Sequence, residues 1–494
     1  MRPMPRFTNA GDLMRRDRDV AKAAIVDLSG SEPRAVSYAG LDAAAAGVAR
    51  ALLTHGLAPG SRIAILGQNS ADYLAAFYGI QRAGLVAVPV NHRFPRETID
   101  SILDDCGARL VFADAARSPL VPAALECVVI GDGSGFARFL DPGAFEPPPI
   151  PDEPAVFLYT SGSTGTPKGV VLSHAGQIWV AETRMGGADL SRHRYLVAAP
   201  LYHMNALALS QLASVAHATI VLLPQFAAPA YIDAIGRFRP TILTAVPPMI
   251  AMMLREEAQL ARTDLSSVEL VRMGSAPVSA SLLAATRRGL PQAQVLNAYG
   301  TTEAGPVVFG PHPQGLKQPD LSVGYPHPAV SLRLGADGVL EMKSPALMLG
   351  YHNRPALRPF TADGYYVTGD VFRRDADGFF FFVGRSDDMF VSGGENIYPG
   401  DVERMLERHP AVAQACVVPV PDEIKGTKPI AFIVPQPGRS ASAQEIKDFA
   451  LAHAPAYQHP RFVFFLDRLP LASTNKLDRA ALLRLAAERL GEAL

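Results

Sequence analysis

The hydrophobic pattern in the first third of the chain alternates between short apolar runs and amphipathic segments. Apolar runs at 62–66, 85–90 and 110–112 predict buried strands. Between them, Ser70 is placed to cap a helix that reaches Tyr78, and the segment 97–105 predicts a second helix. Strands that alternate with helices are typical of an α/β sheet with parallel strands.

Proline and glycine divide the rest of the chain. The run at 141–151 is too rich in proline for a helix or a central strand, so we expect a stiff connection and a subdomain boundary near 142–154. The α/β alternation resumes from 155 to about 296. Shorter strand patterns at 330–342 and 378–383 then predict a β-rich layer.

The last hundred residues predict a compact unit of their own. A helix is expected at 399–408, strands at 415–420 and 430–434, and a second helix at 442–453 that starts with a capping box of Ser442 and Glu445. The predicted fold class is therefore α/β. It has a large N-terminal domain of two α/β subdomains plus a β-rich layer, followed by a small α+β C-terminal domain.

One segment, 201–232, lacks charged side chains if its two histidines are neutral, and it is the only candidate for a membrane span. Asn205, Gln211 and Pro224 interrupt it. We therefore expect a buried helix followed by a core strand at 218–223.

Composition narrows the class of protein. Of 494 residues, 48% are hydrophobic and 19% charged, which excludes a mainly disordered chain. The net charge of −1 and the lack of basic clusters argue against nucleic acid as a partner. Cys106, Cys127 and Cys416 lie far apart without zinc-ligand spacing, and the N-terminus resembles no signal peptide. We expect a cytoplasmic protein.

A hydroxyl-rich loop is the strongest chemical signal. An apolar strand at 155–158 leads into Tyr-Thr-Ser-Gly-Ser-Thr-Gly-Thr-Pro-Lys-Gly at 159–169. Glycines let the backbone approach an anion, hydroxyls and free N–H groups donate to it, and Lys168 adds a point charge. A P-loop is excluded because Pro167 precedes the lysine and Gly169 follows it. The candidate phosphate ligands are Thr160, Ser161, Gly162, Ser163, Thr164 and Lys168.

Five further motifs follow in a fixed order. They are Gly-Ser-Ala-Pro at 274–277, Asn-Ala-Tyr-Gly-Thr-Thr-Glu at 297–303, Thr-Gly-Asp at 368–370 with Gly-Arg at 384–385, Ser-Gly-Gly-Glu-Asn-Ile-Tyr-Pro at 392–399, and Leu-Pro-Leu-Ala-Ser-Thr-Asn-Lys-Leu-Asp-Arg at 469–479. With the hydroxyl loop, they resemble the adenylate-forming superfamily over nearly the whole chain. The nearest resemblance is to 4-coumarate-type and medium-chain acyl-CoA ligases. It implies an AMP-binding domain at 1–385 and a mobile C-terminal domain at 386–494.

The resemblance also implies a role for each motif. Thr302 and Glu303 would hold the α-phosphate and Mg²⁺, Asp370 and Arg385 the ribose, and Lys476 would be the catalytic lysine. Asp387 would be the hinge, and Gly393 and Gly394 would line the pantetheine tunnel. The adenine pocket would comprise Gly274, Ser275, Ala276, Pro277, Asn297, Ala298, Tyr299, Gly300 and Thr301, with the Tyr299 ring stacked on the base.

The acid site is implied by the segment 200–207. It resembles the family's aromatic gate, in which His203 would border the reacting carboxylate and Asn205 would enter the acyl pocket. Further pocket candidates are Met204, Ala276, Gly300 and Val307. Amino acid substrates are disfavoured, because adenylation domains for amino acids place an aspartate in this region to pair the amino group, which Asn205 cannot do. The segment 303–307 resembles aryl-CoA ligases, which favours an aromatic or medium-sized acid.

The implied reaction uses ATP, Mg²⁺ and coenzyme A, releases AMP and pyrophosphate, and needs no nucleic acid or membrane. A monomer or a homodimer is expected. A stand-alone enzyme that loads a carrier protein, a luciferase-like monooxygenase and a nucleotide-binding protein without activity remain as alternatives. Two positions depart from the family pattern. Asn475 replaces a glycine before the catalytic lysine, and Lys428 replaces an acid, either as surface variation or as a contact to the acceptor's phosphates.

Overall fold

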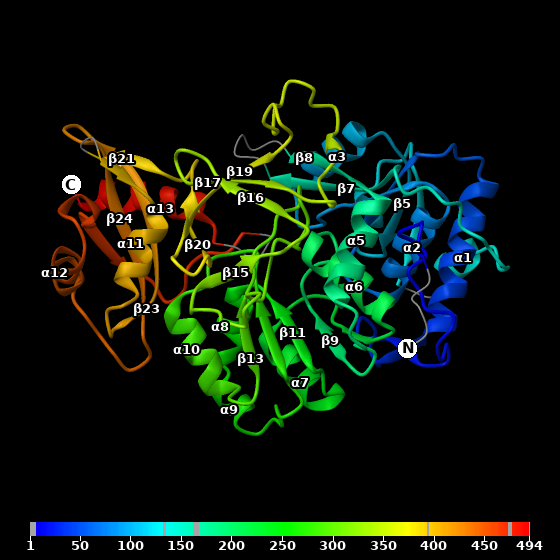
Figure 1. The fold of residues 1–494 in the computed structure, drawn as a ribbon, viewed down its shortest axis with the longest axis horizontal. Coiled ribbons are helices and arrows are strands. Elements are labelled where there is room, and N and C mark those ends of the chain that lie inside the picture. Colours follow the sequence, from blue (N-terminus) through cyan, green and yellow to red (C-terminus); the bar gives the residue numbers. More distant parts are fainter. Residues whose placement is uncertain (1–5, 132–134, 162–166, 393–394, 473–476, 494) are drawn as a thin grey trace.

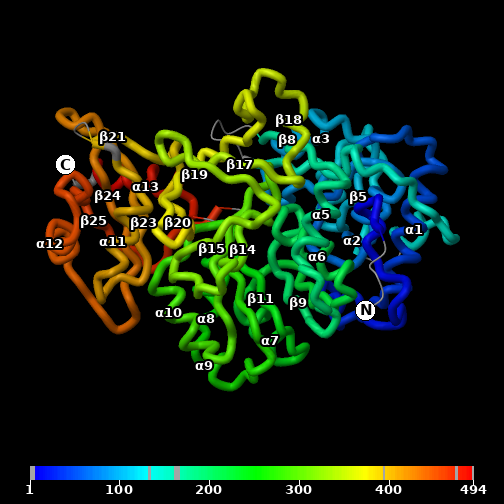
Figure 2. Tube along the Cα trace, viewed as in Figure 1, coloured from blue at the N-terminus to red at the C-terminus, as the bar shows by residue number. Residues whose placement is uncertain are grey.

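The computed structural model describes residues 6–131, 135–161, 167–392, 395–472 and 477–493. Three sheets and their helices form the N-terminal part, and a separate unit follows at the C-terminus. The C-terminal unit lies at the opposite end of the molecule from α1 (Tyr38–Thr54), as Figures 1 and 2 show. The predicted fold class is confirmed.

The first sheet is mostly parallel and has the strand order β18-β8-β7-β4-β3-β5-β6, with β8 antiparallel to both of its neighbours. Ser70 caps α2 through a bond from the Tyr73 amide to its hydroxyl, as predicted, although the helix runs four residues past Tyr78. The elements of this part are β3 (Arg62–Leu66), β4 (Val86–Pro89), β5 (Ala108–Asp114), β6 (Glu126–Ile130), β7 (Pro154–Ser161), β8 (Pro167–Ser173), β18 (Gly350–Tyr351), α2 (Ala71–Arg82), α3 (Arg96–Cys106), the 3₁₀ turn η1 (Ser118–Leu120) and α4 (Gly135–Phe139).

The second sheet has the order β13-β12-β11-β9-β10-β1-β2, parallel except for β2. Helices α7 to α10 lie along its outer side (Figure 1). The elements are β1 (Ala23–Asp27), β2 (Arg34–Ser37), β9 (Arg194–Val197), β10 (Thr219–Leu222), β11 (Ile242–Ala245), β12 (Leu270–Met273), β13 (Gln294–Asn297), α5 (His174–Met185), α6 (Met204–Ala216), α7 (Ala228–Phe238), α8 (Pro247–Leu254), α9 (Glu257–Leu260) and α10 (Ala280–Gly289).

The proline-rich connection does not separate these two sheets. Strand β7 follows it, yet Val156 of β7 pairs with Ala87 of β4 in the first sheet. Conversely, Ile25 of β1 comes from the N-terminal segment and pairs with Ile220 in the second sheet. The subdomain boundary expected near 142–154 is therefore wrong. Local proline content sets the stiffness of a connection, whereas strand pairing depends on partners far along the chain.

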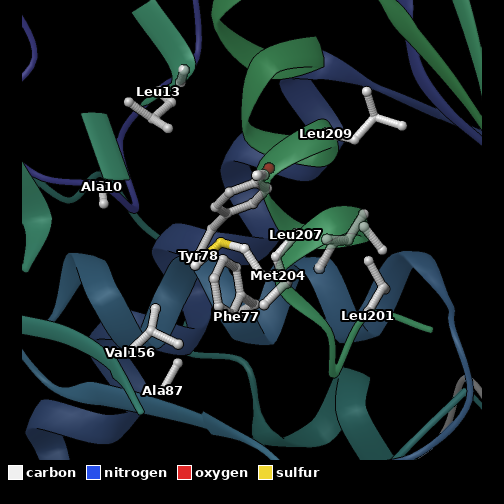
Figure 3. Packing of buried hydrophobic residues seen from close by; sticks show 14 of the residues in the cluster. Ala10, Leu13, Phe77, Tyr78, Ala87, Val156, Leu201, Met204, Leu207 and Leu209 are labelled. Atoms are coloured by element: carbon white, nitrogen blue, oxygen red, sulfur yellow. The ribbon is translucent and has the colours of Figure 1, made fainter. Parts of the chain in front are cut away.

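A layer of helices is packed between the two sheets. Successive residues of β3 face two different hydrophobic clusters. Ile63 and Ile65 join the large cluster, to which α1, α2, α5 and α6 contribute. Ala64 and Leu66 pack with α3 on the outer face of the sheet. Figure 3 shows part of the large cluster, with Met204 of α6 beside Phe77 of α2. Each sheet buries one face against these shared helices, which explains why the strands of both sheets are apolar.

The charge-free segment forms α6 and then β10, as predicted. All α6 residues except Asn205 are buried, and so is every residue of β10. Among the described residues, no helix has the length and apolar character needed to cross a membrane.

The β-rich layer after β13 is an antiparallel sheet in the order β14-β15-β20-β19-β17-β16, and it confirms the strand patterns seen in the sequence. Its last strand ends at Arg385, where the sequence places the proposed domain boundary. The strands are β14 (Phe309–Gly310), β15 (Ser322–Pro326), β16 (Ser331–Leu334), β17 (Val339–Lys343), β19 (Tyr366–Arg374) and β20 (Phe380–Arg385).

The C-terminal unit has its own sheet, β23-β24-β25, with hydrophobic clusters on both faces. The predicted capping box at Ser442 and Glu445 is present at the start of α12. Lys428 lies 3.4 Å from Asp422 in the same hairpin. The elements are β21 (Phe390–Ser392), β22 (Glu395–Ile397), β23 (Val412–Asp422), β24 (Gly426–Pro435), β25 (Phe462–Phe465), α11 (Pro399–Leu406), α12 (Ala443–His453), the 3₁₀ turn η2 (Ala456–Gln458) and α13 (Arg479–Ala493).

Candidate active site

The hydroxyl loop joins the antiparallel strands β7 and β8. Thr160 pairs with Lys168 and Ser161 with Pro167, so the two strands are paired up to the ends of the described ranges. Gly162, Ser163 and Thr164 lie outside the described residues. The Lys168 ammonium lies 6.0 Å from the centre of the Tyr351 ring, and its charge helps to lower the pKa of Asp387. Lys168 therefore lies near Tyr351, and its charge acts on Asp387.

Glu303 stands in a tight segment after β13. Thr301 and Gly305 form an isolated bridge around it, and the Ala304 amide donates to the Thr301 hydroxyl at 3.0 Å. The Tyr351 hydroxyl donates to Glu303 Oε1 at 3.1 Å. Burial raises the pKa of this carboxyl group. A desolvated carboxylate with one oxygen held in place is a suitable ligand for a hard cation.

The predicted ribose pair forms a connected cluster with Tyr299. Arg385 donates to Asp370 Oδ1 at 3.0 Å, and the Tyr299 hydroxyl donates to Asp370 Oδ2 at 2.5 Å. Burial raises the pKa of Asp370, while Arg385 and Tyr299 act against this shift. Each carboxylate oxygen has two lone pairs, so both retain acceptor capacity for a pair of hydroxyl groups. The Tyr299 ring meets Phe372 edge-on at 4.9 Å.

Gly369 allows this cluster to form. Its φ is +73°, a conformation that L side chains rarely adopt, and a Cβ atom there would stand 3.1 Å from the Arg385 guanidinium. Its carbonyl accepts hydrogen bonds from both the amide and the hydroxyl of Ser386. The Thr-Gly-Asp motif thus lets the arginine lie against the strand.

The expected hinge residue is tied to the ribose cluster. Arg385 donates to both carboxylate oxygens of Asp387, at 2.9 and 3.1 Å, while it also contacts Asp370. The Arg385 guanidinium therefore links Asp370 of the ribose cluster to Asp387 at the start of the C-terminal unit. Gly393, Gly394 and the predicted catalytic Lys476 lie outside the described residues.

The remaining adenine-pocket candidates lie at the carboxyl ends of β12 and β13, where ligands bind in open parallel sheets. The Ala298 amide donates to the carbonyl of Met273, which draws the two segments together. Asn297 donates to the carbonyl of Leu321 at 3.0 Å, and Gly300 packs closely on Pro306. This end of the sheet contains Gly274, Ser275, Ala276, Pro277, Asn297, Ala298, Tyr299, Gly300, Thr301 and Thr302.

The acid-site candidates divide into two groups. Met204 and Val307 are 7% and 6% exposed and belong to the large core. His203 and Asn205 keep accessible surface at the start of α6, and the His203 side chain makes no capping bond to that helix. The His203 ring lies 4.6 Å from that of Tyr202.

Tyr351 was missed in the sequence analysis. It reaches Glu303 because β18 pairs with β8, Tyr351 opposite Val170. No local pattern around position 351 indicates a role. Only the strand pairing, which adds residues 350–351 to the first sheet, brings this hydroxyl to the site.

The fold and site define an adenylate-forming enzyme. The chain belongs to the AMP-binding enzyme family, whose model matches residues 15–352, and the model of the AMP-binding enzyme C-terminal domain matches residues 401–476. These matches confirm the resemblance, and with it the reaction class of an AMP-forming acid–thiol ligase.

Similar proteins support that class. The chain is 34% identical to a feruloyl-CoA synthase of Amycolatopsis sp., over 90% of this chain and 92% of the other. It is 33% identical to a fatty acid–[acyl-carrier-protein] ligase, ScoC, of Streptomyces coeruleorubidus, over 91% and 92%. The structure of the anthranilate CoA ligase AuaEII in complex with anthranoyl-AMP superposes with a TM-score of 0.88, at 28% identity and 99% coverage of both chains.

Proposed function

We propose that this enzyme activates an aromatic or medium-sized carboxylic acid with ATP and passes the acyl group to coenzyme A. One observation carries the assignment of the site: Tyr299, Asp370 and Arg385 form one hydrogen-bonded cluster beside Glu303, whose carboxyl group is held by Tyr351. The charges of Asp370 and Arg385 both act on the pKa of Glu303, which supports placing the ribose cluster and the cation ligand in one site. Binding of a nucleotide requires an acceptor for hydrogen bonds from the ribose hydroxyls and a carboxylate that binds the cation on the phosphates.

In the first half-reaction, an oxygen of the substrate carboxylate attacks the α-phosphorus, the bond to the β-phosphate breaks, and pyrophosphate leaves. Asp370 accepts hydrogen bonds from the ribose hydroxyls. Lys168 and the hydroxyl loop bind the β- and γ-phosphates. Thr302 binds the α-phosphate, and His203 borders the acid. Lys476 stabilises the charge that develops between the carboxylate and the α-phosphate.

Glu303 fits a magnesium site. Mg²⁺ in nucleotide enzymes is usually held by one or two carboxylates together with phosphate oxygens and water, and Glu303 is a buried carboxylate with Oε1 fixed by Tyr351. No group of three or more ligating side chains occurs in the part of the chain that the structure describes, so the phosphates would complete the shell. When bound, the cation would neutralise phosphate charge.

In the second half-reaction, the thiol sulfur of coenzyme A attacks the acyl carbon, and AMP leaves. We place the domain boundary after Arg385 and the hinge at Asp387. Rotation there would break the Arg385–Asp387 contacts without disturbing the bond from Arg385 to Asp370. Gly393 and Gly394 would line the pantetheine tunnel. A cytoplasmic location and a monomeric or homodimeric state remain predictions from the sequence.

A pyrophosphate-release assay tests the reaction. Aromatic, branched, dicarboxylic and straight-chain acids are each supplied with ATP and Mg²⁺, with and without coenzyme A, and the thioester and AMP are quantified. We expect at least one acid to give equal amounts of pyrophosphate, AMP and acyl-CoA. Failure of every acid to release pyrophosphate would contradict the proposal.

A carrier protein is the second candidate acceptor, because one similar protein is named as a ligase to an acyl carrier protein. The same assay with coenzyme A and a phosphopantetheinylated carrier in competition separates the two. A thioester formed on the carrier alone would replace coenzyme A in the proposal and leave the adenylation half intact.

Enlarging residue 205 should change the choice of acid. Asn205 keeps accessible surface at the start of α6, between the buried Met204 and Ala206. In Asn205→Phe, the added volume should favour smaller acids by about tenfold or more in kcat/KM, with the KM for ATP unchanged as an internal control. An unaltered ranking of acids would remove Asn205 from the acyl pocket, along with the present reason to exclude amino acids.

A further inference from the structure

Two arginines lie in the layer between the two α/β sheets. Arg184 stands near the C-terminal end of α5, and Arg272 is in β12. In β12, Val271 and Met273 face the outer hydrophobic cluster, so the alternation of side chains turns Arg272 to the opposite face, toward the central layer. Both arginines retain some accessible surface, so a small ligand can reach them.

Neither guanidinium has an acidic partner among the described residues. Nε and Nη1 of Arg184 are buried and make no hydrogen bond there. Burial and, to a smaller extent, the charge of Arg272 lower the pKa of Arg184 to about 9, and only the Tyr195 hydroxyl acts in the other direction. Burial also lowers the pKa of Arg272. Two adjacent, desolvated cations without a counter-ion are costly to the fold, which is the situation that a bound anion relieves.

A third polar group adjoins the pair. Thr244 of β11 is in register with Arg272 of β12, so both side chains face the central layer. The Thr244 hydroxyl oxygen is buried, and it has no hydrogen-bond partner in the described ranges. A hydroxyl and two guanidinium groups without an acidic partner in the described part of the chain are donors that a carboxylate or a sulfonate accepts.

The pair lies on elements that also lead to the predicted acyl pocket. Arg272 precedes Gly274 by two residues, at the carboxyl end of β12. Arg184 is one helical turn beyond Val180, on the same face of α5. Val180 packs on the segment after Glu303, since its Cγ2 lies 3.2 Å from where a Cβ atom on Gly305 would stand. The two arginines therefore lie on the helix and the strand that flank the pocket candidates.

We propose that Arg184 and Arg272 form an anion subsite at the inner end of the acyl pocket, and that the acid activated here carries a second anionic group, a carboxylate or a sulfonate, away from the reacting carboxylate. The inference rests on the proposed function, because it names the substrate class of the same site. Guanidinium groups bind such anions through paired hydrogen bonds. An acid with an apolar end would leave both cations unpaired, so the subsite selects against it.

Matched pairs of acids test the subsite. Terephthalate is compared with 4-methylbenzoate, and adipate with hexanoate, in the wild type and in Arg184→Met and Arg272→Met. The control is Arg192→Met, which removes an exposed arginine paired with Glu269 on the surface. Pyrophosphate release gives kcat/KM, and calorimetry gives the affinity for each acid without turnover.

We expect the wild type to prefer at least one dianionic acid over its partner by about a hundredfold in kcat/KM. Arg272→Met and Arg184→Met should each remove most of that preference, with hexanoate or 4-methylbenzoate used as well as before or better. Arg192→Met should keep the preference of the wild type. Without ligand, Arg272→Met should also melt at a higher temperature than the wild type, because a desolvated cation is gone.

Three results would overturn the subsite. The first is efficient use of the monocarboxylic acids, with a ratio of kcat/KM between the paired acids that neither arginine variant changes. In that case the proposed adenylation reaction would still hold. The second is an equal loss for all acids in Arg272→Met with a lower melting temperature, which indicates a packing role. The third is binding of inorganic sulfate to the wild type without preference for dianionic acids. If no acid releases pyrophosphate, yet terephthalate binds the wild type more tightly than Arg272→Met, the subsite stands and the proposed function fails.

Discussion

Replacing Lys476 with alanine is expected to slow acyl-adenylate formation by about a hundredfold or more. In the proposed mechanism its ammonium group neutralises charge between the attacking carboxylate and the α-phosphate, and one preorganised charge donor in a water-poor site has an effect of about this size. Transfer of the acyl group from a supplied acyl-adenylate to coenzyme A should continue at nearly the wild-type rate. The two half-reactions are measured separately, by pyrophosphate release and by thioester formation.

Lys317→Ala serves as the control, since it removes an exposed lysine from the large domain. It should leave both half-reactions at wild-type rates. An equal loss in both half-reactions of Lys476→Ala would assign this lysine a structural role, and the choice of Lys476 from its motif would then be wrong.

Replacing Glu303 with glutamine should lower kcat/KM by about a hundredfold and raise the Mg²⁺ concentration needed for half-maximal rate. The amide keeps the shape of the side chain and can still accept the hydrogen bond from Tyr351, so the change removes the charge alone. Tyr351→Phe is the matched variant, because it removes that hydrogen bond and keeps the carboxylate. Tyr351→Phe should lose clearly less kcat/KM than Glu303→Gln.

The pH dependence gives an independent check on Glu303. Burial raises the pKa of its carboxyl group, so a proton binds at a higher pH than for a free glutamate. As the pH falls through that raised pKa, the protonated group no longer holds the cation, and the Mg²⁺ requirement should rise. This rise should be absent in Glu303→Gln. A wild-type Mg²⁺ requirement in the glutamine variant would exclude Glu303 as the metal ligand.

Features that depend on neighbouring residues could be predicted from the sequence. Ser70 and Ser442 cap their helices as expected, because a capping bond spans three residues and needs no distant partner. The charge-free segment forms α6 and β10 for a similar reason, since a stretch without charges is stable only inside a core. The motif at 159–169 indicated a phosphate site for the same local reason, and together with the motif at 297–303 it carried the resemblance that implied the reaction class.

The arrangement of the site required the tertiary structure. The Tyr299–Asp370 bond joins residues 71 apart, and the Tyr351–Glu303 bond joins residues 48 apart. Nothing in either spacing along the chain predicts the contact, since it depends on how the β-rich layer and β18 pack on the two sheets. The subdomain boundary expected at 142–154 was wrong for the same reason, because the pairing of distant strands decides which segments share a sheet.

The sequence by itself determined the order of the motifs and those helices and strands whose caps and apolar runs are local, because each depends on short-range geometry. The reaction class followed from the resemblance of those motifs to the adenylate-forming superfamily. Only the tertiary structure decided which side chains share a site. Among the described residues, it gives neither Arg184 nor Arg272 an acidic partner and brings Arg272 close enough to lower the pKa of Arg184, although the two stand on an α-helix and a β-strand far apart in the chain. The charge of a residue can be read from the sequence, but whether that charge is compensated depends on the groups that folding places around it.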